Sequence, residues 1–290
     1  PSRGISYPDS SKWDKPLLLV DSISLATLPI VLVLLQFLAP PGVRSLLTYT
    51  STAPTLHGLF GHWAVHYSPL HLLENAVGFL VVAIAGYLLA WRIDERRWYR
   101  LSVLTIVLVV PAVGAVLSTR AFGTIVPGFD YTSRGASAVV AATLGLAYVL
   151  VLGTVRRTYD LRATISIGGS MLIAVLTILL ARVGTSSVSL LALLLGAAGL
   201  ITVTDGVERL RSETRSAIRY HALLRTVLLA STGTLVMGAY FLALFPANPF
   251  EGQFVTNVFS HAFGFGLGSL IAVWGHRYWT DVNWGNNSRT

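Results

Sequence analysis

Apolar runs of about 20 residues recur along the whole chain, and they constrain its fold more than any other feature. A run of that length crosses a bilayer as a helix, in which every backbone polar group finds a partner. Of the 290 residues, 53% are hydrophobic and only 12% are charged, which is far too apolar for a soluble domain of this length. The sequence therefore predicts an all-α, polytopic membrane helix bundle that forms one integral membrane domain over residues 1–290.

About eight transmembrane helices are expected from the positions of these runs. They cover residues 17–39, 68–91, 101–119, 135–155, 163–182, 186–204, 224–245 and 255–276. Pro111 lies inside the third span and predicts a kink there, because proline cannot donate a helical hydrogen bond. The arginine-rich stretch 205–223 predicts a basic linker on the cytoplasmic surface.

The arginines predict how these spans are oriented. They gather after the second, fourth and sixth spans and near both ends of the chain, whereas the intervening loops carry few. Positive loops stay on the cytoplasmic side, so we expect a multi-pass cell-membrane protein with both termini in the cytoplasm. The polar N-terminal stretch precedes several spans, so no cleavable signal peptide is expected. The net charge of +8 then reflects topology and not nucleic-acid binding.

The composition also excludes several kinds of site. The chain has no cysteine, which excludes disulfides, thiolate catalysis and cysteine metal sites. No nucleotide-binding motif is present, and no cofactor is expected. His62 and His66 are four residues apart and could share a metal ion. No acidic or thiol ligand completes such a set, so we expect these histidines to pin the long, aromatic loop 40–67 instead.

Polar residues of three distant spans are expected at one depth. The second, fourth and eighth spans run in the same direction, which places His71, Asn75, Ser137 and His261 together below the outer surface. Polar groups inside a bilayer are costly and usually functional. Asp21, by contrast, lies near the cytoplasmic end of the first span, where we expect it to be solvated.

These residue types fit the hydrolysis of a peptide bond. Ser137 can attack a carbonyl carbon, and His261 can take and return the proton as general base and acid. No carboxylate lies on the eighth span, so this would be a Ser-His dyad without the acidic member of a triad. His71 and Asn75 lie on one helix face and can donate to a developing oxyanion, together with the backbone N–H of Ser137.

Small residues predict that the serine and histidine helices pack closely. Gly264 and Gly268 are four residues apart on the eighth span, and Ser137, Ala141 and Gly145 form a stripe on the fourth. Small side chains at this spacing let two membrane helices approach each other. A hydrogen bond between Ser137 and His261 requires that approach.

Three motifs, in order along the chain, resemble those of the rhomboid intramembrane serine proteases. Gly135-Ala-Ser-Ala138 is similar to the family's GxSG motif, and His261-Ala-Phe-Gly264 with Gly268 is similar to HxxGxxxG. The string from His62 to Asn75, with His66 and His71, resembles the histidine-rich entry to the family's second helix. The similarity covers about 57–155 and 245–276, so residues of about 163–223 would be inserted or divergent spans.

The resemblance implies a function and a role for each motif residue. Ser137 would be the nucleophile, His261 the base, His71 and Asn75 oxyanion donors, and the glycines Gly135, Gly264 and Gly268 helix-packing supports. Proteins of this family cut transmembrane-helix substrates near the outer membrane face, and the substrate enters sideways from lipid past a mobile helix. By this resemblance we expect the seventh span to be that helix. The implied partners are therefore transmembrane substrates and the bilayer, not nucleic acid or nucleotides.

This sequence departs from the family's pattern in four places, one of which is the absence of the Trp-Arg pair usual in the family's first loop. Ala138 follows the serine where glycine is usual, and Ala141 stands where many relatives carry an aromatic residue. Three expected spans, and not one, separate the serine and histidine helices.

Two alternative functions remain open. One is a catalytically inactive rhomboid-like protein that binds client helices, although relatives of that kind usually lack the serine or the histidine. The other is a transporter with Glu74, His71 and His261 as a proton relay, although no inverted repeat of the kind common in transporters is visible.

Overall fold

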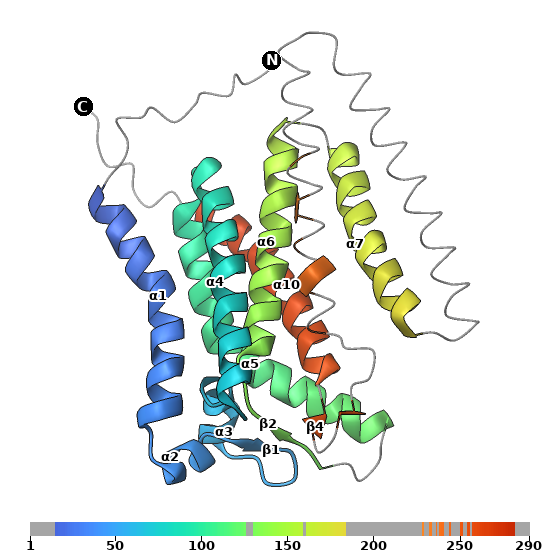
Figure 1. Ribbon diagram of the computed structural model, residues 1–290. Helices are drawn as coiled ribbons and strands as arrows, with labels where there is room; N and C mark the ends of the chain where they lie inside the picture. The colour runs from blue at the N-terminus through green and yellow to red at the C-terminus, as the bar shows by residue number, and fades with distance from the viewer. Residues whose placement is uncertain are drawn as a thin grey trace.

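The computed structural model of the chain is a bundle of long helices (Figure 1). It describes residues 15–125, 130–158, 161–183 and 257–281, together with single positions between 228 and 255. Five of the described helices are long and apolar enough to cross a bilayer. The chain is therefore a multi-pass, all-α membrane protein, as the sequence predicted.

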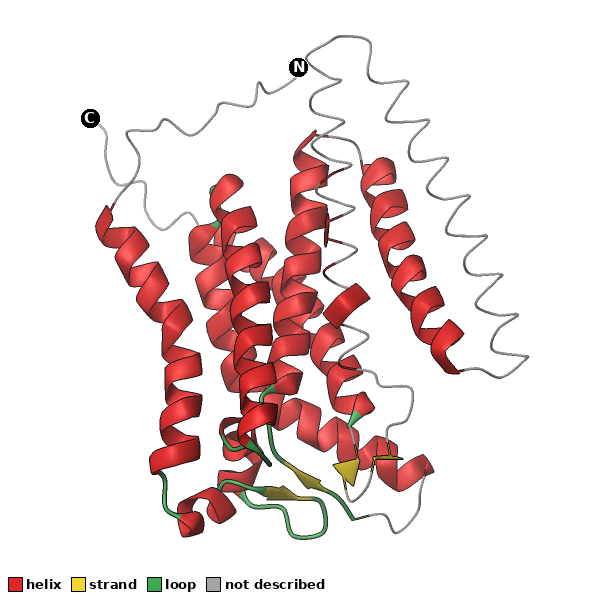
Figure 2. Cartoon of the chain, in the orientation of Figure 1, coloured by secondary structure: helices red, strands yellow, loops and turns green. Residues whose placement is uncertain are grey.

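The helices and strands follow one another in a simple order. The helices are α1 (Lys15–Leu38), α2 (Pro41–Leu46), α3 (Leu56–Gly61), the 3₁₀ turn η2 (His62–Ala64), α4 (Pro69–Arg92), α5 (Arg96–Ile125), α6 (Ser137–Thr158), α7 (Leu161–Val183) and α10 (Val258–Asp281). The strands are β1 (Tyr49–Thr50), β2 (Thr132–Ser133), β3 (Phe250–Glu251) and β4 (Phe254–Val255). Strand β1 pairs antiparallel with β2, and β3 with β4, so extended structure among the described residues is confined to short loop pairs (Figure 2).

Helices α4, α6 and α10 run in one direction, and α1 and α5 run in the other (Figure 1). One end of the bundle, which we call the arginine-rich end, holds Arg96 at the start of α5 and Arg156 and Arg157 at the end of α6. There Glu95, before α5, pairs with Arg157 at 2.9 Å and with His276 of α10 at 3.8 Å. At the opposite end, the loop end, β1 and β2 pair beside the starts of α4 and α6. The predicted parallel course of the second, fourth and eighth spans is confirmed.

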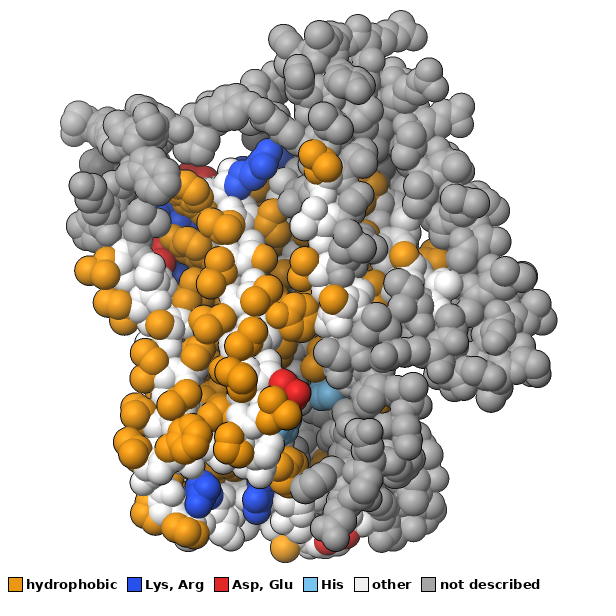
Figure 3. Space-filling view, viewed as in Figure 1, with side chains coloured by type: hydrophobic (Ala, Val, Ile, Leu, Met, Phe, Trp, Pro, Cys, Tyr) orange, Lys and Arg blue, Asp and Glu red, His pale blue; other side chains and the backbone are white. Residues whose placement is uncertain are grey.

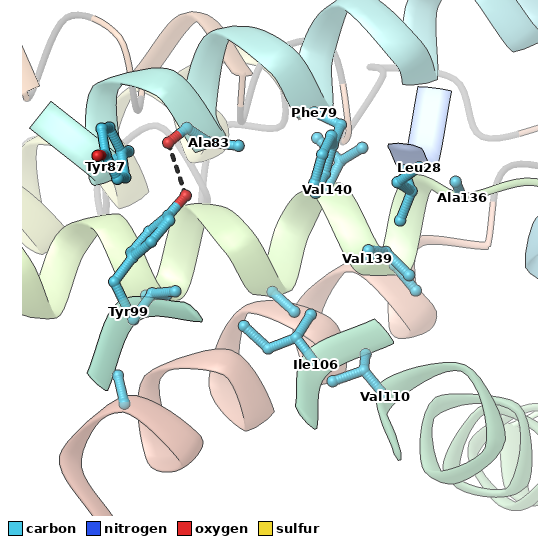
Figure 4. Packing of buried hydrophobic residues seen from close by; sticks show 14 of the residues in the cluster. Leu28, Phe79, Ala83, Tyr87, Tyr99, Ile106, Val110, Ala136, Val139 and Val140 are labelled. Atoms are coloured by element: carbon cyan, nitrogen blue, oxygen red, sulfur yellow. Dashed lines mark hydrogen bonds between the residues drawn. The ribbon is translucent and has the colours of Figure 1, made fainter. Parts of the chain in front are cut away.

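Helix α6 lies at the centre of the bundle. In its membrane-length segment 72% is buried, compared with 28% in α1. Figure 4 shows its residues Val139 and Val140 in one core with Phe79 of α4 and Ile106 and Val110 of α5. Outside this core, hydrophobic side chains cover most of the described face, with basic groups toward its two ends and an acidic group beside a histidine between them (Figure 3).

Local signals in the sequence explain where α4 begins. The hydroxyl of Ser68 accepts the N–H of His71 at 3.1 Å, and Pro69 occupies the first helical position. A serine cap followed by proline is a common helix start, because it satisfies a free amide and needs no N–H from the proline. This cap fixes the position at which His71 enters the bundle.

The structure corrects or extends several expected boundaries. Helix α5 is longer than the expected span 101–119 and contains Pro111, and its later part turns across the loop end of the bundle (Figure 1). Helix α7 coincides with the expected span 163–182. Its described apolar segment, Thr164–Thr177, is shorter than those of the five helices long enough to cross a bilayer. The spans expected at 186–204 and 224–245 and the linker 205–223 lie outside the described residues, apart from single positions of 224–245, so the number eight stays a prediction.

The expectation that Asp21 is solvated is wrong. Its side chain is 2% exposed and accepts a hydrogen bond from the hydroxyl of Tyr87 at 2.5 Å. Arg100 of α5 reaches the same carboxylate at 3.2 Å. The sequence placed Asp21 near the membrane surface but carried no sign that two partners on other helices would cover it.

Candidate active site

Ser137 is the first residue of α6 and follows a sharp turn from β2. Gly135 has φ of +120°, a conformation that side chains rarely adopt, and its N–H donates to the carbonyl of His62 at 3.0 Å. The next amide, of Ala136, donates to Nε2 of His66 at 3.3 Å. These two hydrogen bonds attach the turn to the loop 40–67. The turn places the serine at the N-terminus of a helix, where backbone N–H groups have no helical partner.

The side chains of Ser137 and His261 meet. The hydroxyl of Ser137 and Nε2 of His261 are 2.9 Å apart, although 124 residues separate them. His261 is in the first turn of α10 and is 5% exposed. The predicted juxtaposition of these two side chains is present in the structure.

A backbone carbonyl fixes the orientation of the imidazole. Nδ1 of His261 lies in hydrogen-bonding contact with the carbonyl oxygen of Leu244. A carbonyl can only accept, so Nδ1 carries the proton, and in the neutral ring Nε2 is then the acceptor facing the serine hydroxyl. The carbonyl stands where a triad would place a carboxylate. Residue types gave no signal of it, because every residue has a carbonyl.

Close packing of α6 against α10 makes the contact possible. A Cβ on Gly264 would lie 2.5 Å from the carbonyl oxygen of Ala138, and one on Gly268 would lie 2.0 Å from that of Ala142. In the other direction, a Cβ on Gly145 would lie 2.3 Å from the carbonyl oxygen of Phe265. Backbone touches backbone along this interface, as the small residues predicted.

The two predicted oxyanion residues are placed differently. The ring of His71 lies against Gly135, where a Cβ would come within 2.5 Å of its Cε1, and it stacks on the ring of Tyr67 with centroids 6.0 Å apart. Asn75 is buried on the same helix, and its amide nitrogen donates to the carbonyl of His71 at 2.8 Å. An amide nitrogen carries two hydrogens, so one donor of Asn75 remains beyond this bond.

His62 and His66 connect the loop to the turn before Ser137. Nδ1 of His62 bonds with the carbonyl of Gly58 at 3.0 Å, and the N–H of His66 donates to the side chain of Gln36 in α1 at 3.1 Å. Burial lowers the pKa of His62, and burial together with the neighbouring His71 lowers the pKa of His66 to about 3. Both rings are therefore neutral at pH 7, as the acceptor role of His66 requires.

Further contacts around β1 and β2 were not predicted from the sequence. The carboxylate of Asp130 accepts the hydroxyls of Ser51 and Thr52 at 2.7 and 3.0 Å, and these bonds lower its pKa. Tyr67 bonds with the carbonyl of Thr132, and the guanidinium of Arg134 lies 5.5 Å from the centre of its ring. The strand that leads to the serine is therefore attached to the loop through side chains with no recognisable motif.

A metal centre has no support among the described residues. No group of three or more histidines, cysteines or carboxylates in that part of the chain could hold a metal ion. What the site contains is a hydroxyl, an oriented imidazole and several N–H donors, the groups that acyl transfer needs.

Comparison with protein-family models, with curated proteins and with solved structures finds no match to this chain.

Proposed function

We propose that the chain is an intramembrane serine endopeptidase of the rhomboid type, which hydrolyses peptide bonds of transmembrane substrates. One observation carries the proposal: Ser137 Oγ lies 2.9 Å from Nε2 of His261, whose Nδ1 is engaged by a carbonyl. A serine that merely satisfied itself in a helix would bond to its own backbone.

The reaction follows from this arrangement. Ser137 attacks the scissile carbonyl carbon while Nε2 of His261 accepts the hydroxyl proton, and the Leu244 carbonyl stabilises the imidazolium that forms. The tetrahedral oxyanion is bound by N–H donors, for which the Ser137 amide, His71 and Asn75 are the candidates. The proton of His261 passes to the leaving amine, and an acyl-enzyme on Ser137 remains. Water, deprotonated by His261, then releases the second product.

The position of the dyad supports the proposal that the substrates lie in the membrane. Ser137 and His261 lie near the loop end of helices that cross the bilayer, and the arginine-rich end is opposite. By the positive-inside rule the arginine-rich end faces the cytoplasm, so the site would open toward the outer face of the cell membrane. We infer that cleavage occurs near the outer ends of substrate helices.

Covalent labelling of the full-length protein in micelles by a fluorophosphonate probe tests this proposal. The wild type should be labelled, whereas Ser137→Ala and His261→Ala should not be, and both should stay folded. Ser102→Ala is the matched control, because Ser102 is a buried helical serine near the start of α5, at the arginine-rich end and far from Ser137. A folded wild-type protein that takes no label, and cuts no transmembrane substrate, would instead favour the inactive client-binding alternative.

A further inference from the structure

A groove lies between α1 and α5, with α4 as its floor, away from the serine and the histidine. It encloses about 400 Å³, within the range of small-molecule sites. Thr27 of α1 and Leu104 of α5 line it and are themselves exposed, so the groove opens on the lipid-facing surface of the bundle.

One end of the groove is charged. Asp21, buried at 2% exposure, is bound there by Tyr87 at 2.5 Å and by Nη1 of Arg100 at 3.2 Å. The ion pair neutralises a carboxylate that would be costly in the bilayer. Arg100 remains 38% exposed, and a guanidinium has five N–H donors, of which the carboxylate engages one nitrogen. Arg96 lies one helical turn earlier on α5, so positive charge exceeds negative charge at this end.

The rest of the groove is mostly apolar, because the hydroxyls of Ser24 and Thr27 that line it bond to carbonyls of their own helix, and it has the length of one leaflet. Leu25, Leu28 and Val31 line it from α1, and Phe79 lines it from α4 (Figure 4 shows Leu28, Phe79 and Tyr87 in the same core). From Asp21 to Val31 a helix rises about 15 Å, which is half of a hydrocarbon core of about 30 Å. A transmembrane helix is about 10 Å across with its side chains and needs a wider groove than an acyl chain does, so the width favours an acyl chain as the occupant.

We propose that this groove binds one anionic glycerophospholipid from the leaflet at the arginine-rich end. Its phosphate accepts hydrogen bonds from Arg100, and one acyl chain lies along the apolar wall between α1 and α5. Arginine binds phosphate well because its planar donors match phosphate oxygens. The bound lipid would fill the space beside α1, the least buried of the five membrane-length helices, and so hold it to the bundle.

Native mass spectrometry of the full-length protein, released from micelles, tests the proposal with phosphatidylglycerol and with a diacylglycerol of the same chains. Thr27→Trp combined with Leu104→Trp fills the groove from its two rims. Ile30→Trp combined with Leu108→Trp is the matched control, because these side chains are exposed on the same helices outside the groove. Asp21→Asn combined with Arg100→Gln removes the cation without leaving a buried carboxylate unpaired.

The wild type and the control pair should each retain one phosphatidylglycerol. The groove-filling pair and the uncharged pair should bind it more weakly by roughly tenfold or more, the loss expected for a charge-assisted hydrogen bond or a blocked site. Diacylglycerol, which has no phosphate, should bind the wild type as weakly as phosphatidylglycerol binds these two variants. This result tests the phosphate contact even if the uncharged pair does not fold. Equal retention of phosphatidylglycerol by the groove-filling and control pairs, or of both lipids by the wild type, would overturn the proposal.

Discussion

Gly268 of α10 faces the carbonyl oxygen of Ala142 of α6 so closely that a Cβ at Gly268 would lie 2.0 Å from that oxygen. Gly264, one turn earlier, has the same relationship with Ala138. Ser137 is adjacent to Ala138, and His261 lies less than one turn before Gly264. Any displacement of this interface therefore separates the hydroxyl from the imidazole.

Gly268→Ala and Gly264→Ala should therefore abolish probe labelling of Ser137. The added methyl groups meet backbone, which cannot rotate away, so we expect a loss of unfolding free energy of about 1–3 kcal/mol as well. Labelling and unfolding in micelles measure the two effects. Gly266→Ala is the control on the same helix, because a Cβ there has nothing within 4 Å. If Gly268→Ala were labelled like Gly266→Ala, the close helix approach would not be what positions the dyad.

Gly135→Ala should also prevent labelling, for a different reason. Its φ of +120° is strained for any residue with a side chain, and a Cβ would come within 2.5 Å of the ring of His71. We expect a cost of about 1–3 kcal/mol and a displaced serine. Gly153→Ala, within α6 and with its nearest neighbour at 3.9 Å, is the control for folding and for labelling. Normal labelling of Gly135→Ala would show that the turn before Ser137 tolerates another geometry.

The stability of the protein should fall as the pH is lowered from 6.5 toward 4.5, in part because of His66. Its pKa is about 3 in the folded protein and 6.5 in an exposed chain, so the unfolded state takes up the proton first. The stabilising contribution is complete above pH 6.5 and is lost as the pH falls toward 3. Protonation would also remove the acceptor for the amide of Ala136.

Unfolding in micelles at a series of pH values checks this prediction with His66→Gln, which keeps an acceptor but does not titrate. The slope between pH 6.5 and 4.5 should be shallower than in the wild type, although His62, whose pKa is lowered in the same direction, maintains part of it. His57→Gln is the control, because His57 is exposed in the same loop. An unchanged slope for His66→Gln would mean that this ring is already charged or hydrated in the folded protein.

The parts of the site that depend on residue type could be predicted from the sequence. The contacts that backbone groups or residues distant in sequence provide could not. Ser137 and His261 were identifiable because a hydroxyl and an imidazole stand out in apolar spans, and the helix spacing of Gly264 and Gly268 indicated their packing. The carbonyl of Leu244 and the partners of Asp21 were not predictable. The first involves no particular side chain, and the second depends on how far α1 tilts toward α4 and α5, which local patterns do not encode.

Trp98 connects the start of α5 to the end of α10, far from the serine, and its loss should affect stability more than chemistry. Its indole N–H donates to the carbonyl of Ala272 at 3.0 Å, and its ring meets that of His276 edge-on with centroids 5.2 Å apart. Trp98→Phe keeps an aromatic ring but removes the donor, so we expect a loss of about 0.5–2 kcal/mol in unfolding free energy, the range found for hydrogen bonds between membrane helices. Trp274→Phe is the control, because that ring is 65% exposed on α10. Probe labelling of Ser137 should be unchanged in both variants at temperatures where they stay folded. Loss of labelling in folded Trp98→Phe would show instead that the arginine-rich end of α10 controls the position of His261 at its other end.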